Sequence, residues 1–341
     1  MRLVLSGGWL QKEGLYQANI KKLHLLDSLE ELKPVKLGFL LLSYHYSSKT
    51  LDLPIRHGSY PLVVFLELED VSPFYFNQAQ DVKLNLLSSS FDARSYASGV
   101  SKVREIIAQG VVYQLNLTCR FDFELSGSIT QLFLQYYRKQ PVPFAFLLDL
   151  DQFYLLSGSM ELFLEKRGSL VRSKPIKGTS NKREWLVNSQ KDKAENLMIT
   201  DMVRNDLSKV ALPGTVKVEE LFRVEEFRTL FQMHSSVVAR TNESVVQILK
   251  ATFPPASVVG APKRKAVEMI DQIEPHLREY YCGCAGLVFE KDFTLSVLIR
   301  TALGSGRELS YYSGAGIVWD SVPEREWQEV LLKTKAFYDA F

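Results

Sequence analysis

Cysteine is scarce in this chain of 341 residues, and long apolar runs are missing from it. Its three cysteines are Cys119, Cys282 and Cys284, an odd number that does not suit a disulfide framework. Cys282 and Cys284 lack the CxxC spacing of redox and zinc sites, so we expect packed, reduced thiols. No apolar run approaches the roughly 20 residues of a membrane span, and the apolar start is too short for a secretory signal. These features predict a soluble cytoplasmic protein.

Excess charge of either sign is also lacking. The 41 Lys and Arg residues nearly balance the 39 Asp and Glu residues, which leaves a formal net charge of +2. This balance argues against a nucleic-acid-binding protein, which usually presents a concentrated basic surface. With 46% hydrophobic and 23% charged residues, the composition is that of a globular protein and excludes a disordered chain. The length suits two modest domains or one large domain.

Several catalytic signatures are absent. The sequence contains no Gly-x-Ser-x-Gly or Gly-x-Cys-x-Gly nucleophile elbow, no GxxxxGK[ST] loop, no His-Glu-x-x-His and no GxGxxG after a strand. Acyl-enzyme hydrolysis, nucleoside-triphosphate chemistry and zinc proteolysis therefore have no support.

The hydrophobic pattern predicts strands interleaved with helices, without an obvious linker. This arrangement favours an α+β fold. The main expected strands cover residues 113–125, 144–157, 161–172, 231–239, 281–290, 294–301 and 308–319, and a shorter one lies at 216–218. The main expected helices cover residues 92–110, 129–139, 182–210, 244–252, 263–273 and 324–341.

Lys177 is the first candidate for chemistry. It lies in Pro175-Ile176-Lys177-Gly178-Thr179, where proline and glycine restrict the chain on both sides of the lysine. A lysine at the end of a strand becomes a nucleophile when burial lowers its pKa, because only the free amine attacks. By itself the segment is more typical of a solvated loop lysine.

Paired carboxylates form the second candidate. Asp192 and Glu195 share one helix face, and Glu326 and Glu329 repeat that spacing on the last helix, with Lys333 four residues further. If the two faces converge, they form an oxygen-rich site of the kind that Mg²⁺ prefers. The alternative for each pair is a solvated charged helix face.

Three other features are weaker. Gly260-Ala261-Pro262-Lys263 opens a helix, where free N–H groups favour an anion. Gly314-Ala315-Gly316 lies within a strand, and its small residues would let a ligand approach the backbone. His234 follows an apolar run. Each of the three also has an ordinary structural explanation.

Taken together and in order, these segments resemble the chorismate-utilising enzymes. The resemblance extends from about residue 90 to the C-terminus. The segments that carry it are Gly110–Leu117, Pro175–Thr179, Ala194–Asp201 with Arg204-Asn205-Asp206, Gly260–Lys263, Ile299–Thr301, Gly314–Gly316 and Glu326–Glu329.

Lys177 makes the chain similar to one branch of that family, the aminodeoxychorismate synthases (component I). These characteristically have Pro-Ile-Lys-Gly-Thr, whereas the anthranilate and isochorismate or salicylate synthases typically have alanine in place of the lysine. The resemblance implies that chorismate and ammonia give 4-amino-4-deoxychorismate for p-aminobenzoate and folate biosynthesis. The alternatives are anthranilate or isochorismate synthesis, or a catalytically inactive binding partner.

The resemblance also implies a role for each candidate residue. Lys177 would form a covalent adduct with the substrate, and Glu161 would protonate the departing hydroxyl, with His234 near that hydroxyl and Thr179 beside the ring. Mg²⁺ would be held by Glu195 and Glu329, with Asp192 and Glu326 arranging its water. The substrate would be bound by Tyr281, Arg300, Lys263, Lys333 and the backbone of Gly314, Ala315 and Gly316.

The implied fold is a two-lobed α+β unit with two facing antiparallel sheets, helices outside and the site between the lobes. We expect residues 1–90 to form a short N-terminal part of the β-rich lobe and residues 91–341 to form the catalytic region, within one intertwined domain. The resemblance further implies a separate glutamine amidotransferase that supplies ammonia. The turn before Glu161 departs from the family, with methionine at position 160 where proline is usual.

Overall fold

The computed structural model describes residues 1–76, 82–228 and 230–338 of the chain. Its elements confirm the predicted α+β fold. The strands are β1 (Arg2–Ser6), β2 (Leu15–Leu26), β3 (Gly38–Leu42), β4 (Val63–Pro73), β5 (Lys83–Ser89), β6 (Gln114–Ser126), β7 (Phe144–Asp149), β8 (Tyr154–Ser159), β9 (Leu162–Arg167), β10 (Leu170–Lys174), β11 (Ile176–Ser180), β12 (Lys217–Phe227), β13 (Leu230–Arg240), β14 (Gly260–Ala261), β15 (Cys284–Phe289), β16 (Asp292–Val297), β17 (Thr301–Ser305) and β18 (Glu308–Ile317). The α-helices are α1 (Ser47–Leu51), α2 (Ala93–Ala108), α3 (Ile129–Lys139), α4 (Arg183–Asn188), α5 (Gln190–Ser208), α6 (Val245–Thr252), α7 (Lys263–Ile273) and α8 (Pro323–Tyr338).

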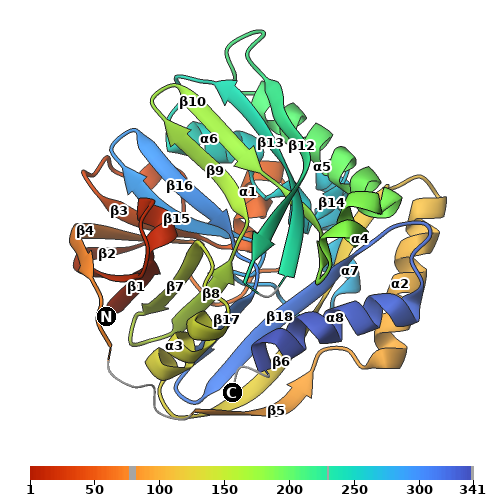
Figure 1. Ribbon diagram of the computed structural model, residues 1–341, viewed down its shortest axis with the longest axis horizontal. Coiled ribbons are helices and arrows are strands. Elements are labelled where there is room, and N and C mark those ends of the chain that lie inside the picture. The colour runs from red at the N-terminus through yellow and green to blue at the C-terminus, as the bar shows by residue number, and fades with distance from the viewer. Residues whose placement is uncertain (77–81, 229, 339–341) are drawn as a thin grey trace.

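Hydrogen bonds join the strands of the described residues into one continuous antiparallel sheet. The ladder runs β12–β13–β10–β9–β16–β15–β3–β4–β2–β1–β7–β8–β17–β18–β6, with β11 beside β13, and β5 and β14 beside β6. The two expected sheets are therefore the two halves of one strip. The half with β9, β10, β12 and β13 and the half with β8, β17 and β18 occupy different parts of Figure 1.

Two short segments connect these halves directly. β8 lies in one half and β9 in the other, so residues 160–161 join them, and residues 298–300 join β16 to β17 in the same way. Paired strands flank each short crossing segment on both sides, although the pairing of β9 with β10 and with β16 shifts register near Leu162. Both crossings contribute residues to the site described below.

Helices cover the outer side of the strip at both ends. α8 runs along β18 in Figure 1, and the Ser313 hydroxyl donates to the Val330 carbonyl at 3.0 Å. α5 packs on β13, where the hydroxyl of Ser235 donates to Asn196 Oδ1 at 2.5 Å. α2 packs on α8 through Tyr96 and Trp327, whose ring centroids are 5.2 Å apart. Over the described residues, none of the helices combines the length and apolar character needed to cross a bilayer.

Three predicted elements are divided in the structure. The strand expected at 144–157 is the hairpin β7–β8, because Asp151 adopts a left-handed turn conformation with φ 66°. The strand expected at 161–172 is the hairpin β9–β10, which turns at Gly168. The helix expected at 182–210 is broken at Ser189, whose hydroxyl caps α5 by accepting from the Asp192 N–H at 3.1 Å. The boundary expected at residue 90 stays a prediction.

Candidate active site

A cavity of about 800 Å³ lies between the two ends of the strip. Its walls come from β11 and β13 on one side, from β18 and α8 on the other, and from the first turns of α5 and both crossing segments. It gathers eleven of the predicted site residues, namely Glu161, Lys177, Thr179, Asp192, Glu195, Tyr281, Arg300, Gly314, Gly316, Glu329 and Lys333. Segments far apart in the sequence therefore meet here.

Lys177 is placed in the cavity by β11. The next residue, Gly178, has φ +93°, and a Cβ there would lie 3.0 Å from Asp192, so the turn beside the lysine requires glycine. Among the described residues, no hydrogen bond or ion pair engages Lys177 Nζ. Burial lowers the pKa of Lys177, and Lys333 acts in the same direction, while Glu195 opposes both. The amine is therefore easier to deprotonate than a solvated lysine, as a nucleophile requires.

Glu161 lies on the first crossing and is only 3% exposed. Its Oε1 accepts from the Ile176 N–H at 3.4 Å, and its own N–H donates to Ser159 Oγ at 3.2 Å. Burial raises the pKa of Glu161 to about 7, against the lowering effect of hydrogen bonds from Ser257 and Ile176. A carboxyl group with this pKa can hold a proton near neutral pH and donate it.

Glu195 on α5 and Glu326 on α8 lie beside the same cation, the ammonium group of Lys191. Lys191 Nζ lies 3.8 Å from Glu195 Oε1 and 3.8 Å from Glu326 Oε1. Burial raises the pKa of Glu195 and of Glu326, whereas Lys333 lowers the pKa of Glu329. Among the described residues no three potential metal ligands lie close together, but the carboxylates of Glu195, Glu326 and Glu329 are oxygen donors of the kind that Mg²⁺ prefers. Glu326 does not line the cavity, but its carboxylate lies beside Lys191, which does.

Two basic residues, Lys333 on α8 and Arg300 on the second crossing, lie together in the cavity wall. Lys333 Nζ donates to the Gly314 carbonyl at 2.9 Å and to Glu329 Oε1 at 2.6 Å. Arg300 Nη1 donates to the Lys333 carbonyl at 3.0 Å, which ties the second crossing to α8. Arg300 also adopts φ 53°, a strained conformation for a residue with a side chain. Two cations are thus held where an anionic substrate could bind.

Small and aromatic residues shape the remaining wall. A Cβ on Gly316 would lie 2.4 Å from Gln114 Nε2 and 3.3 Å from Lys177 Nζ, so a side chain there would push these side-chain ends away. Tyr281 stacks on Tyr312 with ring centroids 5.3 Å apart. Together they provide a flat, mostly apolar surface beside the polar groups.

Besides Glu326, three predicted site residues lie outside the cavity lining: His234, Lys263 and Ala315. His234 is buried, and its Nε2 lies 3.3 Å from Glu225 Oε2 on β12. Lys263 Nζ lies 2.5 Å from Asp206 Oδ2 and also donates to the Thr252 carbonyl at 2.6 Å. Ala315 is buried in the hydrophobic core.

Asn116 and Gln232 are among the polar lining residues that the sequence analysis missed. Asn116 belongs to a segment that carries the family resemblance, but its composition indicates no specific role. Gln232 lies two residues before His234, and only the pairing of β11 with β13 shows that it faces the nucleophile's strand.

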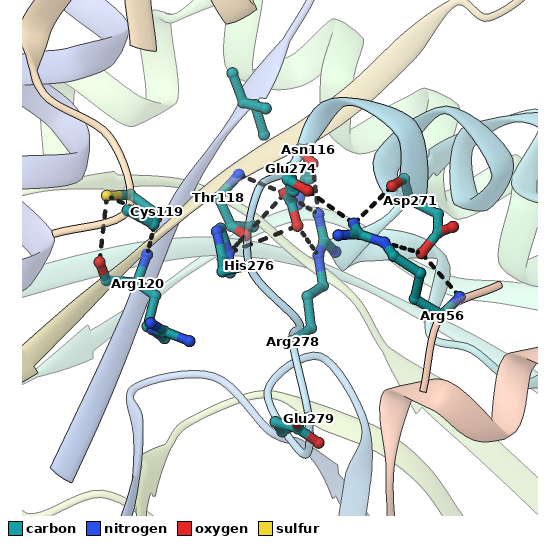
Figure 2. Close-up of polar contacts among 12 residues, drawn as sticks. Arg56, Asn116, Thr118, Cys119, Arg120, Asp271, Glu274, His276, Arg278 and Glu279 are labelled. Atoms are coloured by element: carbon teal, nitrogen blue, oxygen red, sulfur yellow. Dashed lines mark hydrogen bonds and ion pairs between the residues drawn. The ribbon is translucent and has the colours of Figure 1, made fainter. Parts of the chain in front are cut away.

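A buried ionic network supports the cavity wall from behind (Figure 2). Arg278 Nη2 donates to the Asn116 carbonyl at 2.7 Å, and Nη1 donates to the Val258 carbonyl at 2.9 Å. Glu274 Oε1 accepts from Arg278 Nη2 and from the N–H and the hydroxyl of Thr118, each at 2.8 Å. Since Asn116 and Val258 line the cavity, this network fixes part of its wall.

Comparison with known proteins identifies the family. Residues 65–339 match the chorismate binding enzyme family, and the chain belongs to it. The chain is 39% identical over 258 residues to aminodeoxychorismate synthase component 1 of Escherichia coli, covering 72% of this chain and 57% of that protein. It is 34% identical over 265 residues to anthranilate synthase component 1 of Aquifex aeolicus, covering 74% of this chain and 54% of that protein. The matches thus span about half the length of these curated relatives.

Solved structures of the family share the fold. The menaquinone-specific isochorismate synthase MenF of Escherichia coli superposes with a TM-score of 0.81 at 19% identity, covering 99% of this chain and 88% of that chain. Anthranilate synthase component I of Streptococcus pneumoniae gives a TM-score of 0.79 at 20% identity, covering 99% and 92%. These relatives carry out different reactions, so the family is clear while the particular reaction depends on the site.

Proposed function

We propose that the chain is the chorismate-converting component of an aminodeoxychorismate synthase. It would convert chorismate and ammonia to 4-amino-4-deoxychorismate, which leads to p-aminobenzoate and folate. The observation that carries the proposal is Lys177, an amine without an ion pair among the described residues, in a cavity that also holds a buried acid and two further cations. The similarity to aminodeoxychorismate synthase component 1 of Escherichia coli also supports this proposed function.

The proposed reaction uses Lys177 as the nucleophile and Glu161 as the acid. The neutral Lys177 amine attacks ring carbon C2, the ring double bond shifts, and the C4 hydroxyl departs as water with the proton of Glu161. Ammonia then adds at C4, the double bond shifts back, and the bond between C2 and the lysine nitrogen breaks. The two displacements place the amino group at C4 and release Lys177 as the free amine. The proton that the added ammonia loses replaces the one that Glu161 donated, so Glu161 is again protonated.

The other residues bind and orient the substrate. Arg300 and Lys333 would pair with its carboxylates, and Tyr281 would lie against its ring. Mg²⁺, which we propose as the cofactor, would be held by Glu195 and Glu329, with Asp192 and Glu326 beside them, and would neutralise a substrate carboxylate. The proposed source of ammonia is a glutamine amidotransferase partner, and the relatives' names as component 1 support a second component.

A product assay tests this function. The purified chain is incubated with chorismate, Mg²⁺ and ammonium salt, and the products are separated by chromatography and identified by mass. We expect aminodeoxychorismate, which is converted to p-aminobenzoate only when the lyase is added. Lys177→Ala should abolish this product, and Lys174→Ala, a lysine outside the cavity lining, should leave it unchanged.

Other products would decide against the proposal. Anthranilate as the wild-type product would mean that Lys177 does not set the position of amination, and isochorismate would mean that water replaces ammonia. Chorismate binding without turnover would favour an inactive binding partner. Anthranilate formed only by the Lys177→Ala variant would support the proposed role of the lysine.

A further inference from the structure

Gln232 is a buried polar residue in the cavity that the proposed reaction has not used. Its side chain is 4% exposed, and among the described residues Oε1 has no hydrogen-bond partner. Its Nε2 lies 3.5 Å from Thr179 Oγ1, a distance at which any hydrogen bond is weak. A buried acceptor without a partner is unfavourable in the folded protein, and a ligand's donor group would satisfy it.

The strand pairing places Gln232 beside the nucleophile. In the ladder, Gln232 is opposite Thr179 and His234 is opposite Ile176, with a register shift between Ile176 and Thr179. Lys177 lies in that shifted stretch of β11, so Gln232 faces the part of the cavity that holds the amine. His234, expected from the resemblance to lie near the departing hydroxyl, is instead engaged with Glu225.

Resting on the proposed function, we propose that Gln232 is a substrate-binding residue whose Oε1 accepts a hydrogen bond from the single hydroxyl of chorismate. The amide carries no titratable proton and so orients the hydroxyl without protonating it. A hydroxyl that donates its own proton to Gln232 keeps its lone pairs available to the proton of Glu161. Binding and protonation of the leaving group are thus divided between two side chains, a neutral amide and a buried acid.

A comparison of two ligands and two variants tests this role. Chorismate and an analogue that lacks the C4 hydroxyl are titrated into wild type, Gln232→Met and His234→Gln in the presence of Mg²⁺. Methionine has nearly the shape of glutamine but no carbonyl acceptor. We expect Gln232→Met to bind chorismate about 3- to 20-fold more weakly than wild type does, the effect of one lost hydrogen bond. The analogue should bind equally to both proteins, and His234→Gln should retain the wild-type preference for the hydroxyl.

Each outcome has one meaning. Equal weakening for both ligands in Gln232→Met would show a steric effect and overturn the inference. Loss of hydroxyl preference in His234→Gln, with preference retained in Gln232→Met, would also overturn it. If wild type neither binds nor converts chorismate, the proposed function itself fails, and the inference fails with it. Unfolding temperatures measured for the three proteins separate a loss of contact from a loss of fold.

Discussion

Lys191, in the first turn of α5, extends its ammonium to within 3.8 Å of the Glu326 carboxylate on α8. The same ammonium lies 3.8 Å from Glu195, and although burial opposes it, the two carboxylates raise the pKa of Lys191. A lysine cation thus lies among the side chains that we propose for Mg²⁺. The two cations should compete, because like charges a few ångströms apart repel each other even near a protein surface.

We therefore expect Lys191→Met to bind Mg²⁺ about 10-fold more tightly than wild type, in the absence of substrate. Isothermal titration calorimetry measures this affinity directly and does not depend on turnover. Lys102→Met removes the same charge from the exposed face of α2 and serves as the control, with no expected change. Weaker Mg²⁺ binding by Lys191→Met would instead mean that Lys191 helps to assemble the site.

The protonation of Glu161 should limit the rate on the alkaline side. Because the pKa of Glu161 is about 7, the fraction that can donate a proton falls as pH rises through this value. We expect kcat for chorismate to decrease above about pH 7, and Glu161→Gln to lose at least 100-fold in kcat. A pH profile that is flat between pH 6 and 8.5, or a fully active Gln variant, would remove Glu161 from this role.

Glu161 should also make folding depend on pH. Its pKa is raised from 4.5 to about 7 in the folded protein, so the native state binds the proton more tightly than the unfolded state. This contribution to stability is full below pH 4.5 and is lost as pH rises through 7. Glu161→Gln should therefore be more stable than wild type at pH 8, by up to roughly 3 kcal/mol. The difference should shrink towards pH 5, and urea unfolding at both pH values measures it.

The Glu274–Arg278 pair should be costly to break. Both side chains are only 1% exposed, and although burial acts against it, Arg278 lowers the pKa of Glu274. Arg278→Met would leave a buried carboxylate without its cation, and we expect a loss of about 3–5 kcal/mol in the free energy of unfolding. Lys265→Met breaks the exposed pair with Glu268 and should cost less than about 1 kcal/mol. Similar losses for the two variants would contradict the assigned role of burial.

Gly316 should be needed for activity more than for folding. In Gly316→Ala the new methyl group would meet Gln114 Nε2 and approach Lys177 Nζ, both of which are side-chain ends that can move. We expect a folded protein with at least 10-fold lower kcat/KM, because the nucleophile is displaced. Gly99→Ala on α2, whose methyl group would contact only the Leu117 side chain, is the control. Unchanged turnover in Gly316→Ala would show that Lys177 tolerates the displacement.

The sequence predicted the positions of helices and strands better than the turns and breaks that divide them. The helices at 129–139 and 263–273 match α3 and α7, because their apolar spacing is regular. The hairpin turns at Asp151 and Gly168 were missed, because the residues before and after each turn together have the pattern of a single strand. The break at Ser189 was missed for a similar reason, since one capping hydroxyl interrupts an otherwise helical pattern.

Many residues named from motifs line the cavity, and those that do not line it show which information motifs lack. His234 and Gln232 are two positions apart on β13, and their surroundings depend on how β11 and β12 shift register against that strand. Lys263 was expected in the cavity, but the position of Asp206 on α5 draws its ammonium inward. Such choices depend on contacts between segments distant in sequence, which local spacing cannot provide.

The two crossings of the chain have a mechanical consequence. Glu161 and Arg300 lie on the segments that join one half of the strip to the other, and each of these segments is only a few residues long. Residues that line the ligand cavity therefore also connect the two halves directly. A ligand that contacts both Glu161 and Arg300 would therefore restrict the movement of one half relative to the other.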